Sequence, residues 1–85
     1  MTNTQKEELR RLVLGWLAQR AALAFNVSSV QRGVSREMAA TEPEVLEALL
    51  FLESQTLLQI VPNSLGATRY FQITATGTLV YERGQ

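Results

Sequence analysis

The chain has 85 residues, of which 46% are hydrophobic, so it is long enough to form one core and too apolar to be disordered. Eight Lys and Arg residues balance eight acidic residues, all of them Glu, and a neutral total gives no general attraction to nucleic acid or anionic lipid. Cysteine and histidine are absent, which excludes disulfides and thiolate or imidazole metal sites.

These features predict a single domain over residues 1–85 that resides in the cytoplasm and does not bind a membrane. The apolar runs are far shorter than the ~18 residues typical of a membrane-spanning helix. The N-terminal segment MTNTQKEELRR contains no hydrophobic signal region.

The first predicted helix begins at Thr4 and runs to about Ala24. Thr4 and Glu7 have the spacing of a capping box, in which each residue satisfies a free backbone N–H at the start of the helix. Leu14 and Leu23 fall outside the apolar face and are therefore candidates for contact with a second copy of the chain. The apolar face recurs at spacings of three and four and consists of Leu9, Leu12, Val13, Trp16, Leu17 and Ala21.

The second helix is predicted to follow a short extended link, with Ser28 or Ser29 as its N-terminal cap. Gly33 weakens this helix near its middle, by about 1 kcal/mol relative to Ala. The inward face consists of Val27, Val30, Val34 and Met38.

The third helix has the clearest start signal in the chain. Thr41 caps the helix, Pro43 is tolerated in the first turn, and Glu44 completes a capping box. Phe51 lies off the core face and is free to pack against the hairpin or a partner. The core face consists of Val45, Leu46, Leu49, Leu50 and Leu52.

A β-hairpin and a short helix complete the chain. Residues 57–61 are apolar, residues 62–66 form a turn cluster, and residues 68–74 alternate between two faces. One face carries Tyr70 and Gln72 and the other carries Arg69, Phe71 and Ile73, which predicts a strand with one solvated face. Thr74 is predicted to cap the last helix, which returns Leu79 and Val80 to the core.

This order of elements resembles the winged helix-turn-helix superfamily over nearly the whole chain. The segment FQITATGTLV is similar to the hydrophobic-T-x-x-G junction that ends the wing in MarR-like and PadR-like bacterial regulators. The segment LEALLFLESQTLLQIV resembles their recognition helix running into the first wing strand, although Thr56 stands where these proteins usually have Gly. The resemblance implies an α+β, mostly helical fold with a three-helix core, a two-stranded wing and a short C-terminal helix.

The composition argues against an enzyme. The chain lacks His, Cys and Asp, so the usual general bases and thiol nucleophiles are missing. The five glycines are scattered and do not form a phosphate-binding loop. We therefore expect a non-enzymatic protein without a cofactor or a metal.

The resemblance implies a transcription-regulatory module that binds double-stranded DNA, with the third helix in the major groove and the wing along the backbone. Arg32 and Arg36 lie one turn apart on the second helix, and Arg69 lies on the wing. Ordinary surface charge is the alternative explanation for these three arginines. The full set of candidate nucleic-acid contacts is Arg32, Arg36, Arg69, Gln31, Ser35 and Tyr70.

The charge of the third helix favours a different partner. Between Thr41 and Val61 the chain has four Glu and no Lys or Arg, a local charge of −4 that should repel phosphates. The alternative function is a protein-docking surface. The sequence leaves both functions open, and both are compatible with a homodimer that forms through the first and last helices. The candidate docking residues are Glu42, Glu44, Glu47 and Phe51.

Overall fold

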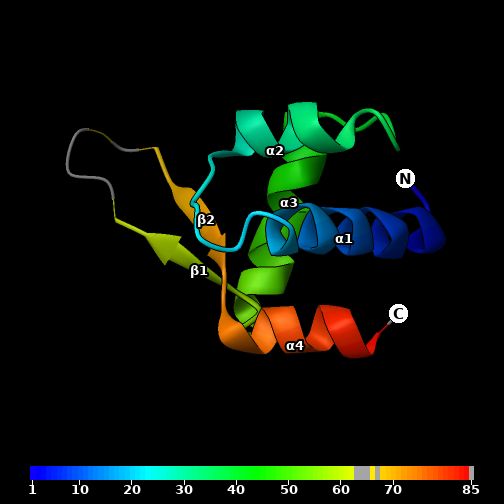
Figure 1. The fold of residues 1–85 in the computed structure, drawn as a ribbon. Coiled ribbons are helices and arrows are strands. Elements are labelled where there is room, and N and C mark those ends of the chain that lie inside the picture. The colour runs from blue at the N-terminus through cyan, green and yellow to red at the C-terminus, as the bar shows by residue number, and fades with distance from the viewer. Residues whose placement is uncertain (63–65, 67, 85) are drawn as a thin grey trace.

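The computed structural model describes residues 1–62, 66 and 68–84. In chain order the elements are α1 (Asn3–Ala18), α2 (Val27–Val34), α3 (Glu42–Ser54), β1 (Leu58–Val61), β2 (Tyr70–Ile73) and α4 (Ala75–Arg83). In Figure 1, α2 and α4 lie at opposite ends of the molecule with α1 and α3 between them, and the β-hairpin extends to one side. The predicted mostly helical α+β fold is confirmed. The predicted turn at 62–66 falls largely outside the described residues.

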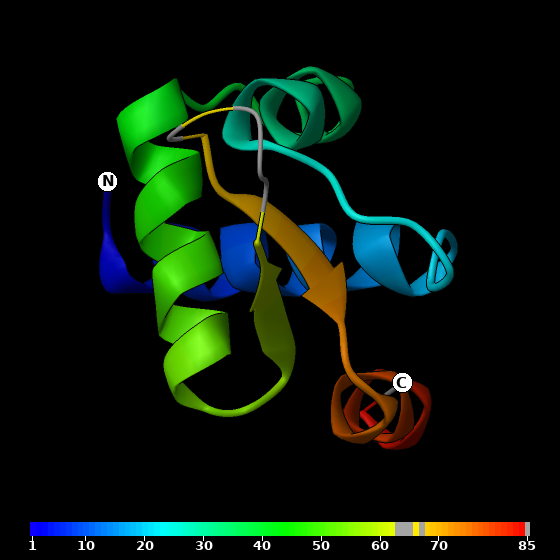
Figure 2. The same cartoon turned by 90° about the vertical axis from the view of Figure 1, so that its left-hand side faces the viewer.

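The hairpin is an antiparallel pair that forms the wing. Leu58 pairs with Ile73, and Val61 pairs with Tyr70. The link after α1 adds a short bridge, because the backbone N–H groups of Phe25 and Phe71 each donate to the other residue's carbonyl, at 2.9 and 2.8 Å. Figure 2 shows α3 on one side of the wing and α2 and α4 toward the other.

The core lies where α1, α2 and α3 meet the inner face of the wing. Phe71 and Ile73 are buried, as the alternation in their strand predicts, and Phe71 is the largest fully buried side chain. The helices contribute the side chains that the three-and-four spacings place inward: Leu9, Val13, Leu17, Val30, Val34, Val45, Leu49 and Leu52.

The predicted start and end of the first helix are wrong. Thr2, and not Thr4, is the N-cap: its Oγ1 accepts from the Gln5 backbone N–H at 3.1 Å, and the Gln5 side chain accepts from the Thr2 N–H at 2.9 Å. The helix ends at Ala18 because the chain must turn back for Phe25 to pair with Phe71.

The predicted cap of the second helix is also wrong. Asn26 caps α2, and its Oδ1 accepts from the backbone N–H of Ser29 at 2.9 Å. A cap at Asn26 lets the helix begin at Val27, so this side chain joins the inward face one turn before Val30. The predicted capping box of α3, formed by Thr41 and Glu44, is confirmed.

The junction between α3 and β1 contains a strained residue. Thr56 has a φ of 62°, the left-handed conformation that side chains with a Cβ, and β-branched ones above all, disfavour. The N–H of Thr56 donates to the carbonyl of Glu53, and the N–H of Leu57 donates to the carbonyl of Leu52, both at 3.0 Å. This pattern is a Schellman motif, which usually has Gly at the left-handed position. The left-handed conformation at Thr56 is thus one that Gly, the residue that the resemblance leads us to expect here, adopts without strain.

Replacing Thr56 by Gly is expected to raise the free energy of unfolding by about 1 kcal/mol, because Gly removes the cost of a Cβ at positive φ. For a domain of this size, that change raises the midpoint of thermal unfolding by about 4–8 °C. Differential scanning calorimetry measures it. Thr56→Ala is the matched control, since it keeps a Cβ and should gain much less. A lower midpoint for the Gly variant would contradict the argument.

The junction between β2 and α4 explains the T-x-x-G motif. Thr74 caps α4 by accepting from the backbone N–H of Gly77 at 3.0 Å. The Thr74 hydroxyl also donates, in a shared hydrogen bond, to the carbonyl oxygen of Thr56 at 2.8 Å and to that of Leu57 at 3.1 Å. Gly77 is buried, and a Cβ at this position would overlap the carbonyl oxygen of Leu57. The motif thus fixes the start of α4 against the junction between α3 and β1.

Two predictions about α4 and α1 are corrected by this packing. Leu79 and Val80 are exposed, at 47% and 43%, because α4 turns Gly77 and Tyr81 toward the rest of the domain. Leu14 belongs to the buried core cluster and is therefore not free for a partner. Leu23 is exposed, as predicted.

Candidate nucleic-acid interface

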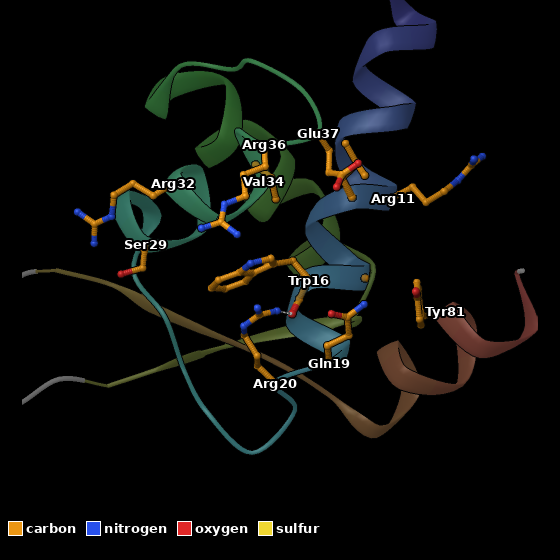
Figure 3. Close-up of a pocket in the computed structure, with 13 residues that line it drawn as sticks. Arg11, Trp16, Gln19, Arg20, Ser29, Arg32, Val34, Arg36, Glu37 and Tyr81 are labelled. Atoms are coloured by element: carbon orange, nitrogen blue, oxygen red, sulfur yellow. Dashed lines mark hydrogen bonds between the residues drawn. The ribbon is translucent and has the colours of Figure 1, made fainter.

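A groove of about 660 Å³ lies between α1 and α2, with Tyr81 of α4 at its edge (Figure 3). Its lining contains four Arg and one Glu, so the charge of the groove is strongly positive although the chain is neutral overall. No α3 residue contributes to the described lining. The charged residues are Arg11, Arg20, Arg32, Arg36 and Glu37.

The floor of the groove is built by Trp16 and Gly33. A Cβ on Gly33 would overlap the indole ring of Trp16, so the glycine that weakens α2 is also what lets the two helices approach. The ring of Phe25 meets the indole edge-on, with ring centroids 4.7 Å apart. The Trp16 side chain is therefore half-buried: it packs against its neighbours and also lines a surface groove.

Arg20 is held in place by the end of α1. Its Nη1 donates to the carbonyl oxygen of Trp16 at 2.9 Å, and its Cζ lies 4.1 Å from the centroid of the Trp16 ring. A guanidinium is favourable here because the last carbonyls of a helix carry partial negative charge. A cation–π attraction between the guanidinium and the indole also stabilises this contact.

The arginines extend along the groove. Figure 3 shows the side chains of Arg20 and Arg36 turned toward Trp16 from opposite sides, while Arg11 and Arg32 point outward at opposite ends. Arg11 pairs with Glu8 at 3.4 Å, but both side chains are well exposed, so the pair is weak. Within the described part of the chain, Arg32 and Arg36 take part in no ion pair.

The structure divides the predicted nucleic-acid contacts between two places. Arg32 and Arg36 lie together in the groove, whereas Arg69 and Tyr70 belong to the wing and do not line it. The other two side chains have internal partners. The Gln31 amide donates to the carbonyl of Ala40 at 2.9 Å, and the Ser35 hydroxyl donates to the carbonyl of Arg32 at 2.9 Å.

Sequence reasoning missed Arg11 and Arg20 as members of this cluster. They lie far before Arg32 in the chain, and nothing in the local pattern of α1 shows which helix will lie beside its outer face. Their spacing of nine residues, close to two and a half turns, gives no simple signal either.

The predicted docking residues of α3 all have partners within the chain. Glu42 accepts from the Ser28 hydroxyl at 3.0 Å, and Glu47 lies 3.6 Å from the Lys6 ammonium. The Phe51 ring, 40% exposed, lies under Arg10, whose Cζ is 3.7 Å from the ring centroid. Lys6 and Arg10 of α1 therefore partly neutralise this flank of the acidic helix.

Glu44, the fourth predicted docking residue, belongs to the capping box. The hydrogen bond from the backbone N–H of Thr41 lowers the pKa of its carboxyl below the usual 4.5. Because the folded-state pKa is lowered, the carboxylate stabilises the fold at pH values above 4.5, and this contribution is lost as the pH falls through the folded-state pKa.

The described residues contain no group of three or more carboxylates that could hold a metal ion. The helices of this described part are too short or too polar to cross a membrane.

Comparisons with known proteins support the architecture. No protein-family model matches the chain, and no curated protein matches its sequence. The structure is similar to a transcriptional regulator from Clostridium thermocellum, with 12% identity and a TM-score of 0.78 over 99% of this chain and 82% of that one. It is also similar to a PadR family transcription regulator from Clostridium difficile, with 17% identity and a TM-score of 0.73 over 89% of this chain and 81% of that one.

A third similar structure concerns the DNA recognition and protein interaction domains of HOP2. It shares 15% identity and a TM-score of 0.66 with this chain, and the match covers 78% of this chain and 98% of that one. At such identities the likeness concerns the fold. With the observed order of elements and the antiparallel wing, these matches show that the chain has a winged helix-turn-helix fold.

Proposed function

We propose that the protein is a non-enzymatic winged-helix module that binds double-stranded DNA and acts in transcription regulation. The observation that carries this proposal is the arginine groove, in which Arg32 and Arg36 are exposed beside two further arginines. The guanidinium group of arginine can donate two parallel hydrogen bonds to phosphate oxygens, and phosphate contacts supply most of the non-specific affinity for DNA. The transcription regulators with a similar structure support the same function.

Within this proposal, Arg32 and Arg36 contact phosphates. Arg69, exposed on the wing, adds a further phosphate contact, with Tyr70 beside it. Gln31 and Ser35 would support Arg32 and Arg36 through the short internal hydrogen bonds that hold α2 and the turn after it.

A homodimer is part of the proposal. Leu79 and Val80 leave an apolar strip exposed on α4, and Leu23 is 58% exposed after α1. A two-fold contact through this strip would bury it, because such an interface uses the same patch on both subunits. A dimer would also present two grooves to one duplex, which doubles the charge available to phosphates.

The test is a salt titration of binding to a generic duplex, followed by fluorescence anisotropy. Binding should be strong at low salt and weaken with a slope in log–log coordinates of about −0.9 per phosphate contact. Arg32→Gln should reduce the slope by about 0.9 and weaken all duplexes equally. Arg83→Gln, at the end of α4 and outside the groove lining, is the matched control for charge. Absence of binding at about 50 mM salt with micromolar protein would overturn the proposal.

A second candidate function is protein docking on α3. The observation that favours it is the outward surface of this helix, where Glu47 and the exposed Phe51 lie and no Lys or Arg of the helix itself is present. The same titration separates the two functions, because a module specialised for protein docking would not bind the duplex at about 50 mM salt.

A further inference from the structure

We propose that the sugar–phosphate backbone of duplex DNA runs along the groove between α1 and α2, so that α3 faces away from the DNA. This inference rests on the proposed function and goes beyond it, because DNA binding by itself does not say which face is used. It adds Arg11 of α1 and Arg20, in the turn that follows α1, to the phosphate contacts.

The distribution of charge on the two faces is the first argument. The groove gathers four arginines and one glutamate, and Arg32 and Arg36 have no carboxylate partner among the described residues. Helix α3 carries four glutamates and no cation, and only Glu47 has a cationic partner in the described chain, namely Lys6 of α1. A polyanion that approaches this molecule is attracted to the groove and repelled by α3.

The arrangement of the arginines is the second argument. A compact anion is best held by donors that converge on one point, as in a bidentate clamp. Here only Arg20 and Arg36 turn inward, toward Trp16, and Arg11 and Arg32 extend outward at the two ends of the groove (Figure 3). Charges spread along a groove fit a ligand whose own charges are spaced along a line, as phosphates are on a DNA strand.

The availability of the donors is the third argument. Arg20 uses Nη1 on the carbonyl of Trp16, which fixes its guanidinium over the indole and leaves its other N–H groups for a ligand. Arg11 is held only by the exposed pair with Glu8, so phosphate can replace that carboxylate at little cost. Because these donors reach phosphates and not base edges, binding should be indifferent to base sequence.

The test compares two adjacent arginines of α1 that lie on different sides of the helix. Arg11→Gln removes a charge from the groove, whereas Arg10→Gln removes the same charge next to Phe51 of α3. If one phosphate contact is lost, Arg11→Gln should weaken duplex binding about eightfold at about 0.1 M salt and reduce the salt slope by about 0.9. Arg10→Gln should change the affinity by less than about twofold, since it lies outside the groove.

A third variant probes α3 directly. Glu47→Gln removes a carboxylate that a duplex on α3 would face, so α3 docking would make this variant bind more tightly, and groove docking would leave the affinity unchanged. Thermal unfolding of each variant checks that the fold is retained. Two duplexes of unrelated sequence, which should bind equally, test the indifference to bases.

The outcomes separate the two proposals. Loss of affinity in Arg11→Gln alone supports the groove. If the wild type binds the duplex, Arg11→Gln binds it equally well and Glu47→Gln binds it more tightly, the assignment of the DNA backbone to the groove is wrong. The proposal that the protein binds DNA would still stand. Failure of the wild type to bind any duplex overturns both. Inorganic pyrophosphate that binds as tightly as the duplex would show a compact anion site and overturn the assignment to a DNA backbone.

Discussion

Replacing Gly77 by Ala is expected to lower the free energy of unfolding by about 3 kcal/mol, the upper part of the usual range for overpacking. The added Cβ would overlap the backbone carbonyl oxygen of Leu57, and a backbone atom cannot move aside as a flexible side chain can. Relief would require α4 to shift, which would also stretch the hydrogen bonds that Thr74 makes to the end of the α3–β1 junction. Urea denaturation followed by circular dichroism measures the loss.

Gly66→Ala is the matched control for this variant. Apart from the two neighbours of Gly66 in the chain, a Cβ on this residue would meet no described heavy atom within 4 Å, so the same substitution should change the free energy of unfolding by less than about 0.5 kcal/mol. Equal stability of the Gly77 and Gly66 variants would show that α4 does not press against the backbone of Leu57.

Replacing Phe71 by Ala is expected to lower the free energy of unfolding by about 3–5 kcal/mol, through lost burial and the cavity that remains. The Phe71 side chain is 0% exposed and its backbone pairs with Phe25, so the residue joins the wing to the helical core. A domain of this size has a total stability of roughly 4–13 kcal/mol. The variant should therefore lose much of its cooperative thermal transition, as calorimetry would show.

Ile60 provides the control, because it pairs with Phe71 in the wing but is 37% exposed. Ile60→Ala should lower the free energy of unfolding by well under half as much as Phe71→Ala, since truncating a partly exposed side chain removes less buried apolar surface. A cost as large as that of Phe71→Ala would mean that the outer half of the wing is packed in a way that the described structure does not show.

Local signals predicted the parts of the fold that local contacts determine. The capping box of α3 consists of residues three apart, and Thr74 and Gly77 have the same spacing at α4. Thr56, which occupies a position where Gly is usual, marked the place where the backbone takes a positive φ. Each of these features depends on a few neighbouring residues, so the sequence shows it directly.

The errors arose where two local signals compete or where distant segments decide. Thr2 with Gln5 and Thr4 with Glu7 are both T-x-x-E/Q patterns, so the local pattern does not distinguish them, and the structure has the first. Leu14 is buried in the core cluster, which brings together residues from elements far apart in the sequence.

The groove was not predicted because segments that are distant in the sequence form it. The sequence pattern identified Arg32 and Arg36, but the other two arginines lie on α1 and in the turn after it. They become neighbours of Arg32 and Arg36 only when Gly33 lets α1 and α2 pack closely. The three-and-four periodicity identifies which face of a helix is buried. It does not identify which exposed faces meet to form a shared surface.

The position of Trp16 gives the molecule an optical reporter of its own. It is the only tryptophan in the chain, and its indole lies on the floor of the groove, in contact with Arg20 and Phe25. Its emission spectrum therefore responds to whatever displaces that guanidinium and also to the loss of the packed interior. The native protein can be titrated without an attached dye, and every photon in a tryptophan-selective measurement comes from this one location.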